Sequence, residues 1–134
     1  MKKTKPADWL FFADSDFTLA KKALEEHIFH LVCFHTQQAA EKLLKAALIA
    51  RGEMPPKTHA LRELYLLVVK YAPELEAHFP ALKRFDRYYM PTRYPDALPG
   101  SLPEGLPVES DAWQAIADAE ALFGLIRPLL ETKA

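Results

Sequence analysis

The residues best suited to chemistry lie between positions 83 and 94, where basic and aromatic side chains are clustered. Four cations and three tyrosines occupy these twelve positions: Lys83, Arg84, Arg87, Arg93, Tyr88, Tyr89 and Tyr94. Arginine makes planar, bidentate contacts with phosphate, and a tyrosine ring offers a face on which a base can stack. The stretch therefore predicts a site for a nucleotide or RNA phosphate. The alternative is that the tyrosines pack on the protein while the arginines extend over its surface.

A second group of polar residues recurs at helical spacing between positions 34 and 45. We call this group the polar stripe: Phe34, Gln38, Glu41 and Lys45, flanked by His35 and Lys42. A solvent-exposed helix face with a Glu41–Lys45 pair is the ordinary interpretation. A surface that meets a second subunit or lines a cleft is the alternative. The opposite side of the same helix is apolar and should be buried in the core, with Cys33, Ala40, Leu43, Leu44 and Ala47.

Other patterns that support catalysis do not occur in the sequence. The paired Glu-x-x-His steps of a di-iron bundle and the His-Glu-x-x-His motif of zinc peptidases are missing, so we predict no metal site. The four glycines are too scattered for a phosphate-binding loop, and we predict no cofactor. Cys33 falls on the apolar side of its helix, which argues against a nucleophilic thiol.

Helical patterns position these residues. We predict helices over residues 6–26, 30–50 and 59–71, a shorter one over 73–89 that breaks near Pro80, and a last helix capped by Ser110. Thr58 should cap the third helix. Residues 91–107 contain five prolines and form a long loop. The fold class that follows is all-α, an up-and-down bundle of four or five helices with a long Pro-rich loop before the last one.

Length and composition indicate a globular protein. The 134 residues have the size of a single domain, which we expect to span residues 1–134. The net charge is −1, so no overall basic excess points to nucleic acid, although acidic residues outnumber basic ones seven to two from Tyr94 onwards. No apolar run is long enough to span a membrane. The start lacks the apolar core of a signal peptide, so we expect no membrane association and a cytoplasmic location.

Three short segments together carry a family resemblance. They read FHTQQAAEKLLKA at 34–46, PKTHAL at 56–61 and PTRYPD at 91–96. In order and spacing they resemble the HEPN domain family of prokaryotic helical-bundle proteins, and the resemblance covers nearly the whole chain. It implies a four- or five-helix bundle that forms a homodimer, commonly beside a small nucleotidyltransferase in a toxin–antitoxin system. Many members of the family are metal-independent ribonucleases with an Arg-x4–6-His motif that both subunits contribute.

The ribonuclease motif of that family does not occur in this sequence. Seven residues separate Arg51 from His59, one too many for the motif, and no histidine follows His78. The segment at 93–95, Arg-Tyr-Pro, resembles instead a branch of the family associated with nucleotide binding and partnering. Whether the chain is an enzyme therefore remains open at the level of sequence.

These observations lead to one leading hypothesis and two alternatives. The leading hypothesis is a dimeric nucleotide- or RNA-binding module that acts with a nucleotidyltransferase. Arg93 captures phosphate, Tyr94 stacks on a base, and Arg87 and Lys45 supply positive potential where two subunits meet. The remaining predicted ligand-binding residues are His35, Gln38 and Glu41. The first alternative is a ribonuclease toxin with a displaced site that uses Arg93 with His35 or His59. The second is a structural protein in which the polar stripe and residues 93–95 only build the dimer.

Overall fold

The computed structural model describes residues 4–88 and 105–131, and every regular element within these ranges is helical. The elements are α1 (Pro6–Glu25), α2 (Phe29–Ala50), α3 (Leu61–Val68), the 3₁₀ helix η1 (Pro73–His78), α4 (Phe79–Asp86) and α5 (Glu109–Glu131). The predicted all-α fold is confirmed. No helix within the described ranges is long and apolar enough to cross a membrane.

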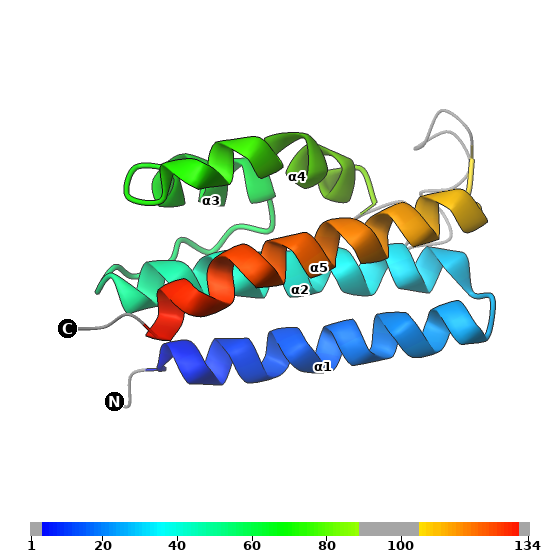
Figure 1. Ribbon diagram of the computed structural model, residues 1–134, viewed down its shortest axis with the longest axis horizontal. Coiled ribbons are helices and arrows are strands. Elements are labelled where there is room, and N and C mark those ends of the chain that lie inside the picture. Colours follow the sequence, from blue (N-terminus) through cyan, green and yellow to red (C-terminus); the bar gives the residue numbers. More distant parts are fainter. Residues whose placement is uncertain (1–3, 89–104, 132–134) are drawn as a thin grey trace.

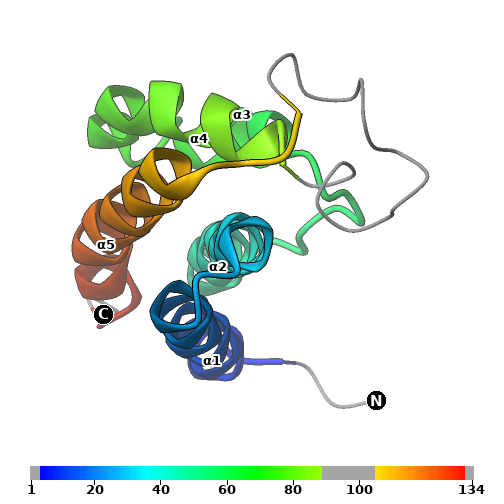
Figure 2. The ribbon, with the colours of Figure 1, turned by 90° about the vertical axis from the view of Figure 1, so that its right-hand side faces the viewer.

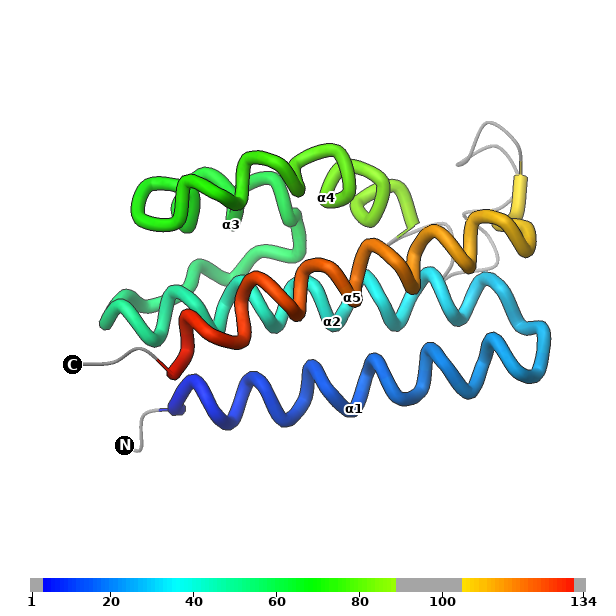
Figure 3. Tube along the Cα trace, in the orientation of Figure 1, coloured from blue at the N-terminus to red at the C-terminus, as the bar shows by residue number. Residues whose placement is uncertain are grey.

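The three long helices, α1, α2 and α5, pack along one another, and the shorter elements form a second layer. Figure 1 shows α3, η1 and α4 lying over α2 and α5, and Figure 2 shows that this layer is on the side away from α1. The chain runs out along α1, back along α2, out again through η1 and α4, and back along α5 (Figure 3). This is the predicted up-and-down order, and α3 is the helix predicted over 59–71, shorter at both ends.

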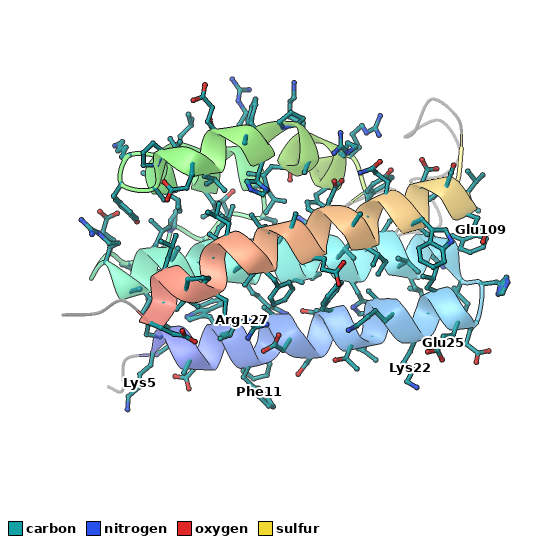
Figure 4. All side chains as sticks on the ribbon, in the orientation of Figure 1. Lys5, Phe11, Lys22, Glu25, Glu109 and Arg127 are labelled. Carbon is teal, nitrogen blue, oxygen red and sulfur yellow. The ribbon has the colours of Figure 1, made fainter. Side chains whose placement is uncertain are left out.

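α2 is the central helix of the bundle because it contacts each of the other four α-helices. Its apolar side is fully packed, and the five residues predicted for the core are all buried there: Cys33, Ala40, Leu43, Leu44 and Ala47. α5 closes the bundle against α1. The rings of Phe17 and Phe123 stack with centroids 5.1 Å apart, and Arg127 donates to Asp14 at 2.9 Å. Figure 4 shows Arg127 reaching from α5 towards α1.

The start of α3 differs from the prediction. The helix begins at Leu61, and the Thr58 hydroxyl accepts a hydrogen bond only from the Ala60 amide, at 3.1 Å. The first amides of α3 are satisfied by a residue of α4 instead. The Asp86 carboxylate accepts from the Leu61 amide at 3.0 Å and from the Arg62 amide at 3.3 Å. The prediction that Thr58 caps this helix is therefore wrong, because the capping group comes from a distant part of the sequence.

Two further helix ends show how local signals compete. The predicted break near Pro80 falls slightly earlier, since η1 ends at His78 and Pro80 lies in the first turn of α4. A proline is tolerated there because first-turn amides have no intrahelical partner. α5 begins at Glu109, so Ser110 lies inside the helix rather than capping it. The Asp111 carboxylate accepts from the Val108 amide at 2.9 Å.

Candidate functional site

The polar stripe of α2 is buried at its centre. Glu41 is 5% exposed and Lys45 8% exposed, and the other four members are half-buried. The covering chain is the connection over residues 51–60, which leaves the end of α2 and returns beside it to reach α3 (Figure 1). The ordinary interpretation of a solvent-exposed face is therefore wrong. The interpretation failed because it considered α2 by itself, without the connection over residues 51–60 that covers this side of the helix.

Glu41 is the centre of a hydrogen-bonded group that we call the Glu41 cluster: Gln37, Gln38, Glu41, Lys45 and His59. The Lys45 ammonium donates to a Glu41 oxygen at 2.9 Å, and His59 Nδ1 lies 3.2 Å from both carboxylate oxygens. Gln37 Nε2 donates to the His59 carbonyl at 3.2 Å, and Gln38 Nε2 donates to Gln37 Oε1 at 2.7 Å. These bonds join two of the segments that resemble the HEPN family, 34–46 and 56–61.

Lys45 neutralises the buried carboxylate of Glu41. The two side chains are only 9% and 7% exposed, and a buried carboxylate without a cation would be costly. The ring of Trp9 in α1 lies 5.8 Å from the Lys45 ammonium and covers it from the side of the first helix. The charge of Lys45 is thus matched within the chain by Glu41.

His59 is the most exposed member of the cluster. Its side chain is 60% exposed, while the carboxylate that binds its Nδ1 is 7% exposed. A carboxylate on one ring nitrogen fixes the orientation of a histidine, as it does in enzymes in which histidine moves protons. The arrangement therefore presents an oriented and accessible imidazole from the connection between α2 and α3, held against Glu41 of α2.

Asp86 connects the end of α4 to this region. Burial raises the pKa of the Asp86 carboxyl, the two backbone hydrogen bonds from α3 oppose that rise, and the negative charges of Glu41 and Glu63 add to it. Asp86 thus brings together the first turn of α3 and the last turn of α4. Each of those turns carries an exposed guanidinium next to the contact, Arg62 and Arg87. From the sequence, Asp86 is only a charge that opposes its basic neighbours, and no local pattern reveals its contact with α3.

The predicted basic and aromatic stretch divides between structural and exposed residues. Arg84 makes a bidentate pair with Asp118 of α5, with both bonds at 2.9 Å, and Gln114 donates to the same carboxylate. Tyr88 is 5% exposed and belongs to the core. Arg87 is exposed, with its guanidinium 5.7 Å from the centre of the Tyr88 ring. For Arg84 and Tyr88, the packing alternative is the correct one.

Two of the predicted binding residues, Arg93 and Tyr94, lie outside the described residues. The described chain runs to Tyr88, which directly follows the last turn of α4. Arg93 is five residues further along.

His35 belongs to a different polar group, between α1 and α2. Its Nδ1 lies 3.0 Å from one oxygen of Asp16, and the Lys42 ammonium donates to the other oxygen. Burial of Asp16 opposes its charged form, but the hydrogen bonds and charges of His35 and Lys42 outweigh burial and lower its pKa. The structure therefore places Gln38, Glu41 and Lys45 together, and it places His35 against α1.

Metal ligation and thiol chemistry find no support in the described part of the chain. Within residues 4–88 and 105–131, no three His, Cys, Asp or Glu side chains are grouped to hold a metal ion. Cys33 is fully buried, and burial raises the pKa of its thiol to about 12. A thiol of this kind stays protonated and unreactive at neutral pH.

Two solved structures share the whole architecture. The crystal structure of TT1696 from Thermus thermophilus superposes with a TM-score of 0.81 at 29% sequence identity, over 92% of this chain and 97% of that one. The crystal structure of ST0689, described as an archaeal HEPN homologue, gives a TM-score of 0.75 at 26% identity. That match covers 96% of this chain and 99% of ST0689.

A curated relative and a family model agree with these structures. The Methanocaldococcus jannaschii protein named "Putative toxin MJ1304" is 26% identical over 131 residues, covering 90% of this chain and 85% of that protein. The model of the HEPN domain matches residues 6–129, from the first turn of α1 to the last turns of α5. The resemblance of the three short segments thus extends over the complete helical bundle, and the chain belongs to the HEPN domain family.

Proposed function

We propose that this HEPN chain binds the phosphate of a nucleotide or of RNA at the Glu41 cluster and the adjoining end of α4, as one subunit of a homodimer. The observation that carries the proposal is the accessible His59, which the buried Glu41–Lys45 pair orients, together with the exposed Arg62 and Arg87 beside Asp86. Guanidinium groups bind phosphate in planar, bidentate geometry. Because α2 packs against α1, α3, α4 and α5, it provides the rigid support that such a site needs.

Arg93 and Tyr94 complete the proposed site. Arg93 follows Tyr88, the last described residue after α4, by five positions in the sequence. In the proposal Arg93 binds the phosphate and Tyr94 stacks on a base, while Arg87 adds positive potential. Lys45 acts indirectly, because it holds the carboxylate that orients His59.

The biological setting that we propose is a toxin–antitoxin system in which a nucleotidyltransferase is the partner protein. The support is the similarity to the M. jannaschii protein whose name describes it as a toxin. The family resemblance of residues 91–96 points in the same direction. A cytoplasmic location and a single domain over residues 1–134 belong to the same proposal.

A second candidate function, a metal-independent ribonuclease with a displaced active site, is favoured by the Glu41–His59 contact. RNA cleavage without a metal needs a group that takes a proton from the attacking 2′-hydroxyl or gives one to the leaving oxygen, and histidine exchanges protons near neutral pH. His59 is exposed and oriented, whereas His35 is bound to Asp16 between two helices. If the chain cleaves RNA, His59 is therefore the better candidate of the two.

The binding proposal is tested by measuring the affinity of the purified protein for a labelled single-stranded RNA and for nucleotides. We expect Arg93→Ala to weaken binding about tenfold or more, because a charge-assisted bond contributes about 1.5–3 kcal/mol. Lys70→Ala is the matched control, since Lys70 is an exposed cation between α3 and η1. Unchanged affinity of the Arg93→Ala protein would exclude this site. A change in its monomer–dimer balance with unchanged ligand affinity would favour the structural alternative.

The ribonuclease candidate is tested on the same RNA, end-labelled and incubated in the presence of a chelator. Cleavage by the wild-type protein that is lost in His59→Gln, and retained in His78→Gln, would assign acid–base chemistry to His59. Growth arrest on expression would accompany such an activity. If the wild-type protein binds the RNA without cleaving it, the ribonuclease candidate is excluded and only the binding function stays.

A further inference from the structure

The layer of short helices carries a half-buried aromatic pair. The rings of Tyr65 in α3 and Phe79 in α4 lie with centroids 4.6 Å apart and planes tilted by 31°. The Lys83 ammonium lies 5.1 Å from the centre of the Phe79 ring. Tyr65 packs against the hydrophobic core, whereas Lys83 is exposed. The pair is therefore anchored through Tyr65, and a flexible cation lies over its other ring.

Exposed cations of the same layer lie in line with this pair. Lys83 and Arg87 are four residues apart, so their side chains leave the same face of α4, about 6 Å apart along the helix axis. Arg87 lies at the end of α4, beside the contact of Asp86 with α3, where Arg62 is also exposed. Figure 4 shows nitrogen-tipped side chains projecting from the outer side of this layer. A row of cations thus leads from the end of α4 to the Phe79 ring.

Asp86 and Glu63 are acidic neighbours of this row. Asp86 is half-buried, and its carboxylate accepts hydrogen bonds from two backbone amides of α3. Glu63 is exposed on α3. Three exposed cations, Arg62, Lys83 and Arg87, outweigh these two carboxylates. The α4 side of the layer therefore attracts phosphate.

Cations interleaved with aromatic rings are the means by which proteins hold a single strand of nucleic acid. Bases stack on the rings, and the cations follow the phosphates. The contact of an exposed lysine with an aromatic ring is weaker than the stacking of a base on the same ring. A base that reaches Phe79 therefore displaces the Lys83 ammonium, which then turns to the adjoining phosphate.

We propose that a single strand of RNA runs along a surface that we call the α3–α4 face: Arg62, Tyr65, Phe79, Lys83 and Arg87. One phosphate lies between the two arginines, the next lies at Lys83, and a base stacks on Phe79, which Tyr65 supports. This inference rests on the phosphate binding of the proposed function, and it adds the class of ligand, a strand rather than a mononucleotide, and the path of that strand. Because every base has a face that stacks, we expect little sequence preference.

The path is tested by comparing the affinity of each variant for an oligouridylate of about eight nucleotides with its affinity for uridine monophosphate. Phe79→Leu keeps an apolar side chain beside Tyr65 but removes the stacking ring. We expect it to weaken binding of the oligomer about tenfold and to leave binding of the mononucleotide unchanged. Phe11→Leu is the matched control, because Phe11 is an exposed phenylalanine of α1, on the opposite side of the bundle (Figure 2). Circular dichroism checks that each variant is folded.

The role of Lys83 is tested by the dependence of the oligomer affinity on salt. Each phosphate contact that is lost lowers the slope of log affinity against log salt concentration by about one. We expect this change for Lys83→Gln. Lys22→Gln, at an exposed lysine of α1, should keep the wild-type slope. An unchanged slope for Lys83→Gln would overturn the phosphate contact at Lys83.

Photochemical cross-linking locates the stacked base directly. An oligouridylate that contains 5-iodouridine is irradiated with the wild-type protein, and the cross-linked peptide is identified by mass spectrometry. We expect the cross-link at Phe79 or Tyr65. A cross-link confined to aromatic residues of α1 or α5 would overturn the proposed path.

The two ligands separate a failure of this path from a failure of the proposed function. If the wild-type protein binds the mononucleotide and gains nothing from the longer strand, the path is overturned and the phosphate site stands. The same conclusion follows if Phe79→Leu leaves the oligomer affinity unchanged, which would make the α3–α4 face available to a protein partner instead. Equal weakening of both ligands in Phe79→Leu would also overturn a separate stacking position. If neither ligand binds, the proposed function fails, and the path fails with it.

Discussion

The buried pair of Glu41 and Lys45 is the residue-scale feature on which the candidate site depends. Removing one member of such a pair leaves an uncompensated charge, whereas removing both can be nearly neutral. We therefore expect Lys45→Met to lower the free energy of unfolding by about 3–5 kcal/mol. Combining it with Glu41→Gln should recover most of that loss. Urea denaturation of the two single variants and the double variant measures the coupling energy between Glu41 and Lys45. If the losses of the single variants add up in the double variant, the two side chains are not coupled.

Asp16 should make the stability of the bundle depend on pH at the acidic end. Its pKa is lowered in the folded protein, because the contacts of His35 and Lys42 outweigh burial. A carboxyl with a lower pKa in the folded state adds stability above its unfolded pKa, and that contribution is lost as the pH falls through the folded pKa. We expect the stability difference between the wild type and Asp16→Asn to be full at pH 6 and to shrink below about pH 4.

Denaturation curves of the wild type and Asp16→Asn between pH 2.5 and pH 6 provide the measurement. Asp14→Asn is the control, because Asp14 lies on the same helix and pairs with Arg127 near the surface. A difference that is constant over this range would show that the charge of Asp16 does not contribute.

The sequence predicted individual site residues wherever their partners are close along the helix. Spacing alone brought Gln38, Glu41 and Lys45 together, because a helix has a fixed period. The partner of Glu41, His59, lies eighteen positions away and reaches it only because the connection after α2 folds back. No local pattern encodes such a return, although the two prolines at 55 and 56 favour extended chain.

At the scale of elements, Asp86 joins α4 to α3 across 25 positions. Asp86→Ala would leave two amides of the first turn of α3 without their acceptor, at a cost of about 1–2 kcal/mol. Thr58→Ala removes a single bond to the Ala60 amide outside the helix and should cost less. Thermal denaturation of both variants tests this order. A larger loss for Thr58→Ala would return the capping role to that residue.

The long helices were predictable from the sequence to within one or two residues, and the short elements were not. α1 ends at the turn around His27, which has a φ of 60°. α2 ends just before Gly52, which has a φ of 81° that glycine adopts without strain. The first residues of α3 and α5 depend on carboxylates that accept hydrogen bonds from backbone amides at the start of each helix. Asp86 is far away in the sequence, and Asp111 competes locally with Ser110. Which of several nearby residues caps a helix depends on the three-dimensional geometry of the chain, and amino-acid composition does not specify that geometry.

At the scale of the whole molecule, α2 is the central helix and carries one of the three segments that resemble the family. A helix that contacts four others has a constraint on each face, so its apolar side and its polar stripe are both set by packing. Peripheral helices carry fewer constraints, and α1 has one face that no described part of the chain covers.

The contact of Asp14 with Arg127 has a consequence for how this protein is made. The two residues are 113 positions apart, so the ring that they close includes most of the chain. During synthesis, α1 and α2 are complete long before α5 is available to cover them. A product that stopped before Phe123 would leave Phe17 without its stacking partner. Completion of the last helix is therefore the step that turns the nascent chain into a closed bundle.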